Sequence, residues 1–357
     1  MDLFVAILLL IVGFVILIKG ADFLVEGAAS VAKQFGISDL IIGLTIVSMG
    51  TSAPELVVNI NVAIKSMSTD PEGLKMIFGN VFGSNIFNTC LILGVAGMII
   101  PLAVQKNTAF KELPFSLFIV LIVFFLGNDV MFLGATKNTF SRLDGGTLLV
   151  FFVGFLLYIY KNAKTPQQEI AMTNVDTGEE ENSLDTDLTE LKEDEEEIKV
   201  MPTWRSSIYI LLGIGGLLGG GTLVLDKSIF LAETFGMTKR VIGLTVVAIG
   251  TSLPELATSA VSAAKGNSDI AVGNVIGSNV FNILLVLAVS TVITPVDYDI
   301  ASNFDIYFLV GATVLLFVFL FIGSKGTRNS FLVDRWQAGV LLLAVTIYTV
   351  YLIAYAK

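Results

Sequence analysis

Ten long apolar stretches, separated by short polar segments, follow one another along the chain. Their approximate limits are 3–32, 39–65, 76–101, 113–127, 145–161, 206–234, 239–264, 270–294, 304–323 and 335–355. An α-helix needs roughly 20 residues to cross a hydrocarbon core about 30 Å thick, so each stretch predicts a transmembrane helix. The fourth stretch is the shortest and is followed directly by Asn128 and Asp129. The pattern therefore predicts an all-α integral membrane protein with ten transmembrane helices.

One polar segment interrupts this alternation. Residues 165–200 contain thirteen Asp or Glu and two Lys, a local charge of −11, against a formal charge of −10 for the whole chain of 357 residues. Few apolar residues are available there to form a core, so the segment is expected to be a solvated linker. Loose calcium binding by the linker is a weaker alternative, because no EF-hand spacing is present. The linker, residues 165–203, divides the chain into halves at 1–164 and 204–357.

Composition narrows the possible functions. Apolar residues make up 54% of the chain and charged residues only 15%, where a soluble domain has roughly a quarter. Histidine is absent and Cys90 is the only cysteine, which excludes imidazole catalysis, internal disulfides and thiolate zinc sites. We therefore predict a protein that is not an enzyme and has no cofactor. Outside residues 165–200 the chain carries a charge of +1 and no Lys/Arg cluster, so nucleic acid is not an expected partner.

An internal repeat is the most informative feature. The segment GLTIVSMGTSAPEL at 43–56 returns as GLTVVAIGTSLPEL at 243–256, and GNVFGSNIFN at 79–88 returns as GNVIGSNVFN at 273–282. The copies fall in the regions 39–101 and 239–294, five predicted crossings apart, and an odd number of crossings inverts the second half relative to the first. Two inverted five-helix repeats with interrupted helices are typical of secondary transporters, whose ion site lies where the repeats meet.

The two prolines of the first motif predict where the helices are interrupted. Pro54 has no N–H, so the carbonyl of Gly50 loses its helical donor and the helix should kink there. Pro254 has the same effect on Gly250. A freed carbonyl inside a bilayer is tolerated only where protein, water or an ion satisfies it.

Oxygen-bearing side chains gather around these breaks. Helical spacing places a Thr and a Ser on the face of each motif glutamate, and a Ser and an Asn share one face of the following span. These residues are Thr51, Ser52, Glu55, Ser84 and Asn88 in the first half and Thr251, Ser252, Glu255, Ser278 and Asn282 in the second. Ligands that are all oxygen suit Ca²⁺ and other hard cations.

Glu55 and Glu255 are the only acidic residues near the middle of the predicted spans. An ionisable group at that depth is costly and indicates a functional site. The alternative is a pair of neutral glutamic acids that bond one helix to another, which explains neither the prolines nor the duplicated hydroxyls.

Other small and polar residues allow structural interpretations. For Asn80, Asn85, Asn274 and Asn279, hydrogen bonding between helices or helix capping is at least as well supported as contact with an ion. The glycines of the sixth span favour close helix packing over a phosphate-binding loop. They are Gly215, Gly216, Gly219 and Gly220.

The paired Gly-Thr-Ser-x-Pro-Glu and Gly-Ser-Asn-x-Phe-Asn segments resemble the alpha repeats of the cation/calcium antiporter superfamily, most closely the prokaryotic sodium/calcium exchangers. The resemblance implies that the ten oxygen-bearing residues above ligate Ca²⁺ and Na⁺, with the backbone carbonyls of Ser48 and Ala248. Potassium-dependent relatives carry Asp where this chain has Asn282, and a proton-coupled branch resembles Gly-Asn-x-x-Glu at the first motif. Potassium- or proton-coupled calcium antiport therefore remains the alternative function.

Membrane orientation and partners follow from the same observations. With the N-terminus outside, the inner loops hold twelve Lys or Arg and the outer side eight, a positive-inside bias that agrees with a cytoplasmic linker in the family. The resemblance implies the plasma membrane of a prokaryote, Ca²⁺ and Na⁺ as transported substrates, and a first and sixth helix that slide over the other helices. An ion channel is a rival class, but it does not require an inverted duplication. No protein partner is predicted.

Overall fold

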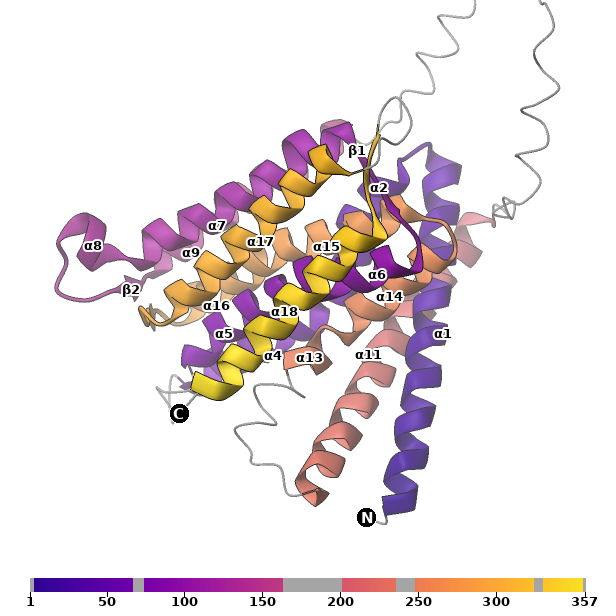
Figure 1. Cartoon of the computed structure of the whole chain (residues 1–357), viewed down its shortest axis with the longest axis horizontal. Coiled ribbons are helices and arrows are strands. Elements are labelled where there is room, and N and C mark those ends of the chain that lie inside the picture. Colours follow the sequence, from indigo (N-terminus) through magenta and orange to yellow (C-terminus); the bar gives the residue numbers. More distant parts are fainter. Residues whose placement is uncertain (1–2, 67–73, 163–200, 236–247, 324–329, 356–357) are drawn as a thin grey trace, which may run out of the picture.

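The computed structural model describes residues 3–66, 74–162, 201–235, 248–323 and 330–355, and long helices dominate these ranges (Figure 1). The first half contains α1 (Leu3–Phe35), α2 (Asp39–Ile42), η1 (Gly43–Val47), α3 (Ser48–Thr51), α4 (Ala53–Ser66), α5 (Lys75–Ile86), η3 (Phe87–Ile92), α6 (Leu93–Ile99), β1 (Leu102–Gln105), η4 (Thr108–Glu112), α7 (Leu113–Gly127), α8 (Asp129–Leu133), β2 (Thr139–Phe140) and α9 (Arg142–Asn162). The second half contains α11 (Thr203–Thr234), α13 (Ala248–Thr251), α14 (Leu253–Ala264), α15 (Ser268–Phe281), η6 (Asn282–Leu287), α16 (Ala288–Ile293), β3 (Val296–Asp297), α17 (Ser302–Ile322), β4 (Ser330–Val333) and α18 (Arg335–Tyr355). Segments labelled η are π-helical turns that continue a neighbouring α-helix.

The described helices agree with most of the predicted spans. Eight of them are long and apolar enough to cross a membrane, and a ninth candidate is the bent pair Asp39–Thr51 and Ala53–Ile64. The seventh predicted span, 239–264, begins outside the described ranges, and its later part forms α13 and α14. Most of the predicted linker, 165–203, also lies outside the described ranges. The chain is therefore a helical membrane protein.

The fourth span begins earlier than the sequence predicts. The helix that crosses here runs over Thr108–Gly127, not 113–127, because η4 leads directly into α7. Its polar residues Thr108 and Glu112 are buried against the rest of the protein, at 0% and 5% exposure. A hydropathy pattern counts such residues as polar, so it places the start of the helix too late.

Two short sheets correct the all-α prediction. β1 pairs antiparallel with β4, with Leu102 opposite Val333, and β2 pairs antiparallel with β3, with Thr139 opposite Asp297. Each sheet joins a loop of the first half to a loop of the second half, and the two sheets lie at opposite ends of the helical body (Figure 1).

The spans that carry the second repeated motif form the centre of the molecule. In the most apolar windows of Met76–Ile99 and Ser268–Ile293, 72% and 78% of the residues are buried inside the protein. The corresponding share is only 22–39% in the other six candidate spans. The second motif of each half is thus surrounded by protein, whereas the outer helices expose apolar side chains as lipid-facing helices do.

The outer helices α1 and α11 pack together through glycines (Figure 1). A Cβ added at Gly20 would lie 2.6 Å from the backbone nitrogen of Leu217, and one added at Gly213 would lie 2.6 Å from that of Leu24. The absence of side chains lets the two backbones approach closely, which stabilises helix pairs in a membrane. Of the four glycines predicted for this role, Gly216 and Gly220 meet α1, whereas Gly215 and Gly219 have open space beside them.

We expect Gly213→Ala to lower the stability of the protein, because its methyl group would overlap backbone atoms of α1. Overpacking of this kind costs about 1–3 kcal/mol. Gly215→Ala is the matched control on the same helix: nothing lies within 4 Å of its added Cβ, and alanine is the better helix former. Thermal unfolding in detergent measures both variants. Equal unfolding temperatures would contradict the close contact between α1 and α11.

Candidate functional site

Two equivalent helix breaks position the site. In the first half α3 ends at Thr51 and α4 begins at Ala53, and Ser52 between them has φ −82° and ψ 4°. In the second half Ser252 separates α13 from α14 with φ −89° and ψ 8°. These angles lie near the sparsely populated bridge region, away from α-helical values. The first break, between Gly50 and Pro54, bends the helix by 45°, and the second break lies at the equivalent place between Gly250 and Pro254.

The breaks bring a glutamate from each half to a shared buried position. Glu55 and Glu255 are each 1% exposed, and their carboxyl groups interact electrostatically. The Ser52 hydroxyl, from the first half, donates a 3.0 Å hydrogen bond to Oε1 of Glu255 in the second half. The site is therefore formed by both halves together.

The second motif adds further polar groups around the carboxyl groups. The Ser84 hydroxyl lies beside Glu55, and the hydroxyls of Thr51 and Ser278 lie beside Glu255. Asn88 and Asn282 are also buried, at 1% and 0% exposure. Thr251 and Ser252 are 7% and 3% exposed. All ten predicted side chains of the site are therefore withdrawn from the protein surface.

Many of these buried oxygens lack a hydrogen-bond donor. Within the described residues, no partner is found for Oε1 and Oε2 of Glu55, Oε2 of Glu255, Oγ of Ser252, Oγ of Ser278 or Oδ1 of Asn88 and Asn282. Buried polar groups in proteins are almost always paired, and an unpaired carboxylate is especially costly. A cluster of such oxygens has the chemistry of a site for a hard cation.

The two predicted carbonyl ligands differ in how far the structure describes them. The Ser48 carbonyl accepts a 2.9 Å hydrogen bond from the backbone N–H of Ser52, and the Thr51 hydroxyl lies 3.2 Å from it. An ion that binds this oxygen would have to share it or replace one of these contacts. Ala248 opens α13, directly after residues outside the described ranges.

The asparagines with a structural interpretation, Asn80, Asn85, Asn274 and Asn279, form hydrogen bonds between helices. Asn80 donates to Asn59 at 2.8 Å, and Asn85 donates to the carbonyl of Asn279 at 3.1 Å. Asn279 in turn donates to the hydroxyl of Thr89 at 2.9 Å. Asn59 and Thr89 lie outside both repeated motifs, so the repeat did not identify them.

Asn274 has the most contacts of this group. Its amide donates to Ser259 Oγ at 2.9 Å and to the Glu255 carbonyl at 3.4 Å. Its Oδ1 lies 3.1 Å from the Thr51 hydroxyl in the other half. The residue therefore connects the two helix breaks.

A cavity of about 370 Å³ borders one side of the site. It is lined by residues of α4, α11, α13 and α14, including Pro54, Pro254 and Thr251. Apart from Thr251 and Thr222, its lining is apolar.

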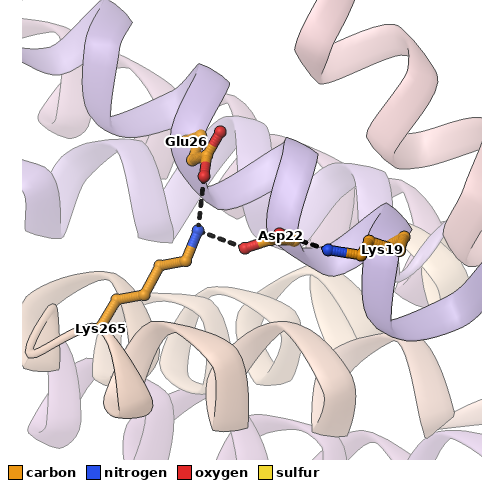
Figure 2. A network of polar contacts seen from close by, with 4 residues as sticks. All are labelled: Lys19, Asp22, Glu26 and Lys265. Carbon is orange, nitrogen blue, oxygen red and sulfur yellow. Dashed lines mark hydrogen bonds and ion pairs between the residues drawn. The ribbon is translucent and has the colours of Figure 1, made fainter. Parts of the chain in front are cut away.

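A group of charged residues joins α1 to the end of α14 (Figure 2). Lys265 forms ion pairs with Asp22 and, at 3.0 Å, with Glu26, and Lys19 lies 3.5 Å from Asp22. Burial acts to lower the pKa of Lys265, but its hydrogen bonds to Asp22 and Glu26 and their charges outweigh burial and hold that pKa above its ordinary value. Lys265 thus stays protonated and ties α1 to the helix that carries Glu255.

The chain is similar in sequence and fold to known membrane proteins. A family model described as sodium/calcium exchanger protein matches residues 5–161 and 205–354. The chain is 38% identical over 291 residues to the inner membrane protein YrbG of Escherichia coli K12, covering 82% of this chain and 81% of that protein. It is 29% identical over 359 residues to the sodium/calcium exchanger MaX1 of Methanosarcina acetivorans, covering 97% of each. Its fold is similar, with a TM-score of 0.74, 28% identity and full coverage of both chains, to the sodium-calcium exchanger NCX_Mj soaked with 10 mM Na⁺ and zero Ca²⁺.

We expect Asn274→Ala to destabilise the protein more than Asn80→Ala, the equivalent change in the first half. Asn274 is fully buried, and its loss leaves Ser259 and Thr51 without a partner that each has now. A buried polar group that is left without a hydrogen-bond partner lowers stability by about 1–3 kcal/mol. Asn80 is only partly buried and donates to a single side chain. Thermal unfolding of the two variants without added divalent ions tests the order, and a larger loss in Asn80→Ala would contradict it.

Proposed function

Because the chain belongs to the sodium/calcium exchanger protein family, we propose that it is a secondary active antiporter that exchanges Ca²⁺ for Na⁺. The observation that carries the proposal is the buried pair Glu55 and Glu255, contributed by opposite halves, in which three of the four carboxylate oxygens lack a donor among the described residues. The related proteins named above as exchangers are transporters, which supports a protein that is not an enzyme.

The proposed architecture is ten transmembrane helices arranged as two inverted five-helix repeats, residues 1–164 and 204–357. Three symmetric features support it: the two matching breaks at Ser52 and Ser252, the five predicted crossings between equivalent motifs, and the two sheets that each pair one strand from either half. β1 and β3 each follow the third span of their half, and β2 and β4 each precede the fifth span. β1 pairs with β4 and β2 pairs with β3, so the two sheets are built in the same way with the roles of the halves reversed.

The proposed ion ligands are oxygen atoms from both halves. They are the side chains of Glu55, Glu255, Thr51, Thr251, Ser52, Ser252, Ser84, Ser278, Asn88 and Asn282 and the carbonyls of Ser48 and Ala248. Ca²⁺ takes 6 to 8 oxygen ligands at roughly 2.3–2.6 Å, and Na⁺ is also a hard cation. Two carboxylates and a surplus of neutral oxygens can therefore serve both ions in turn.

Charge balance couples the two fluxes. Two ionised glutamates carry a charge of −2, which one Ca²⁺ neutralises as fully as two Na⁺. The ions compete for a single neutralised state, so release of one is required before the other binds. An empty site with two bare carboxylates is costly in a medium of low dielectric constant. Crossing without an ion is thus disfavoured, and exchange becomes obligatory.

The conformational change is proposed to be a sliding of α1 and α11 over the helices that carry the motifs. The glycine contact joins α1 and α11 into one unit. The cavity beside Pro54 and Pro254 reaches Thr251 along α11, whereas the Lys265 ion pairs hold α1 against the far end of α14. In the proposed cycle, this arrangement would be a site that is open toward one side of the membrane and closed toward the other.

The positive-inside bias places the linker and the Lys265 end of α14 in the cytoplasm and the N-terminus outside. We propose the plasma membrane of a prokaryote as the location, in agreement with the inner-membrane name of the Escherichia coli relative. The cavity beside Thr251 would then face outward.

We expect Ca²⁺ to enter vesicles that contain the purified protein and are preloaded with Na⁺, and not vesicles preloaded with K⁺ or with neither ion. Glu55→Gln and Glu255→Gln should each abolish uptake, because one remaining carboxylate no longer balances Ca²⁺. Asp305→Asn is the control, since Asp305 lies on α17 and bonds Tyr348 away from the site. Uptake driven by a proton gradient or by K⁺ alone would support the proton- or potassium-coupled alternative, and single-channel currents would indicate a channel.

Acidification should slow this uptake. Carboxylates bind cations only when deprotonated, so protons compete with Ca²⁺ for Glu55 and Glu255. The initial rate of Na⁺-driven Ca²⁺ uptake is therefore expected to fall between about pH 8 and about pH 5, and raising the Ca²⁺ concentration should partly restore it. A rate that does not change over this interval would count against carboxylates as the coupling groups.

A further inference from the structure

A second cavity, of about 350 Å³, lies between α7 and α9, away from the ion site. Phe115, Phe151 and Phe155 supply its apolar lining, and Phe115 and Phe155 stack with their ring centroids 5.5 Å apart. Gly154 also lines it, and nothing lies within 4 Å of the position that a Cβ would take there. The cavity is thus an apolar groove on an outer face of the helical body, left open in part by a missing side chain.

Three polar side chains border this groove: Lys111, Glu112 and Tyr158. Glu112 is 5% exposed, and its Oε1 accepts a 2.5 Å hydrogen bond from the Tyr158 hydroxyl. Its Oε2 is buried and has no hydrogen-bond partner in the described part of the chain. Lys111 is exposed and forms no ion pair with the described residues. The groove therefore pairs an acceptor that lacks a donor with a cation that lacks a counterion.

These groups lie close to the ends of their two candidate spans. Glu112 is the fifth residue of the span Thr108–Gly127, and Tyr158 lies four residues before the end of the span Arg142–Asn162. At 1.5 Å per residue, both are about 6 Å from the end of their spans. Tyr160, which is 81% exposed, and Lys161 mark the same end, as is typical of a membrane interface.

We propose that this groove binds an aminophospholipid through its headgroup, with the primary ammonium on Glu112, the phosphate facing Lys111 and an acyl chain along the phenylalanine rings. The ammonium of such a headgroup supplies the donor that Oε2 of Glu112 lacks, and its phosphate supplies a counterion for Lys111. Binding requires a rotation about the last side-chain torsion of Glu112, which has a broad energy minimum; this rotation moves Oε1 and Oε2 together, so the Tyr158 hydroxyl must follow Oε1.

The unpaired oxygen also selects among lipids. An ammonium group has three N–H donors and forms a charge-assisted hydrogen bond with a carboxylate. The trimethylammonium group of a choline lipid has the same charge but no N–H, so it leaves Oε2 unsatisfied. A lipid that forms this charge-assisted hydrogen bond should bind roughly tenfold to hundredfold more tightly than one that cannot. The groove should therefore prefer ethanolamine over choline headgroups on identical acyl chains.

The second half offers a matched comparison. Asp305 on α17 accepts a 2.8 Å hydrogen bond from Tyr348 on α18, so each half has a carboxylate–tyrosine pair between its last two long helices. There the rings of Phe304 and Phe308 pack against Tyr348, with centroid distances of 6.3 and 4.7 Å. Asp305→Asn is thus a control that alters the equivalent pair without altering the groove.

The experiment measures binding of phosphatidylethanolamine and phosphatidylcholine with identical chains to the delipidated, purified full-length protein, by native mass spectrometry and by thermal stabilisation. We expect the wild-type protein to bind the ethanolamine lipid at least about tenfold more tightly. Glu112→Gln should remove this preference and Asp305→Asn should retain it. Gly154→Leu should weaken binding of both lipids, because leucine fills the groove.

Several results would overturn the proposal. They are equal affinity of the wild-type protein for the two lipids, a preference that survives Glu112→Gln, and unchanged lipid binding in Gly154→Leu. Soluble phosphoethanolamine that binds as tightly as the lipid would assign the groove to a free amine and not to a membrane lipid. If Glu112→Gln fails to fold, the comparison of lipids on the wild-type protein and Gly154→Leu still decides. Because the readout is lipid binding, the result is independent of which ions the protein transports.

Discussion

The buried charge of two carboxyl groups is the constraint on which the rest of the structure depends. Glu55 and Glu255 are almost completely buried, and most of their oxygens have no donor among the described residues. An isolated carboxylate in such surroundings costs several kcal/mol or more, and removal of its counter-charge makes the site unstable. A protein can keep two of them there only if a cation, or a proton, regularly occupies the site. In the proposed antiport, this requirement for a counter-ion is what couples the two ion fluxes.

The surrounding fold holds these groups in place through contacts from both halves. Around the site, Asn274, Asn85 and Asn279 link helices of both halves by hydrogen bonds, and the two second-motif spans are mostly enclosed by protein. The pair α1 and α11 lies outside this centre and meets it through a buried apolar cluster, which includes Leu24, Leu217 and Leu253, and through the ion pairs of Lys265 (Figure 2). A site enclosed by both halves beside a separate helix pair is the arrangement that the proposed alternating access uses.

The repeat and the apolar pattern predicted most of the long helices and a helix interruption beside Pro54, and the ten side chains that they singled out lie buried in the structure. The strict spacing of polar residues on helices made this possible, because positions three and four apart must share a face. Other features depend on contacts between distant segments and were not visible in the sequence. The start of the fourth span at Thr108 depends on the burial of Glu112. The two sheets depend on which loops of the two halves meet. The ion pair between Lys265 and Asp22 forms only because α14 packs beside α1. The hydrogen bonds that the Ser48 carbonyl accepts likewise depend on the local geometry at Ser52.

Equilibrium binding of Ca²⁺ to the purified protein, followed by calorimetry with and without Na⁺, tests the central claim most directly. The account predicts one Ca²⁺ per chain, displaced by Na⁺, and loss of binding in Glu55→Gln and in Glu255→Gln alike. The double variant should bind no more weakly than either single one, because residues that share one ion are strongly coupled. Ca²⁺ binding that survives with unchanged affinity when either glutamate is replaced would show that the two carboxylates do not share an ion.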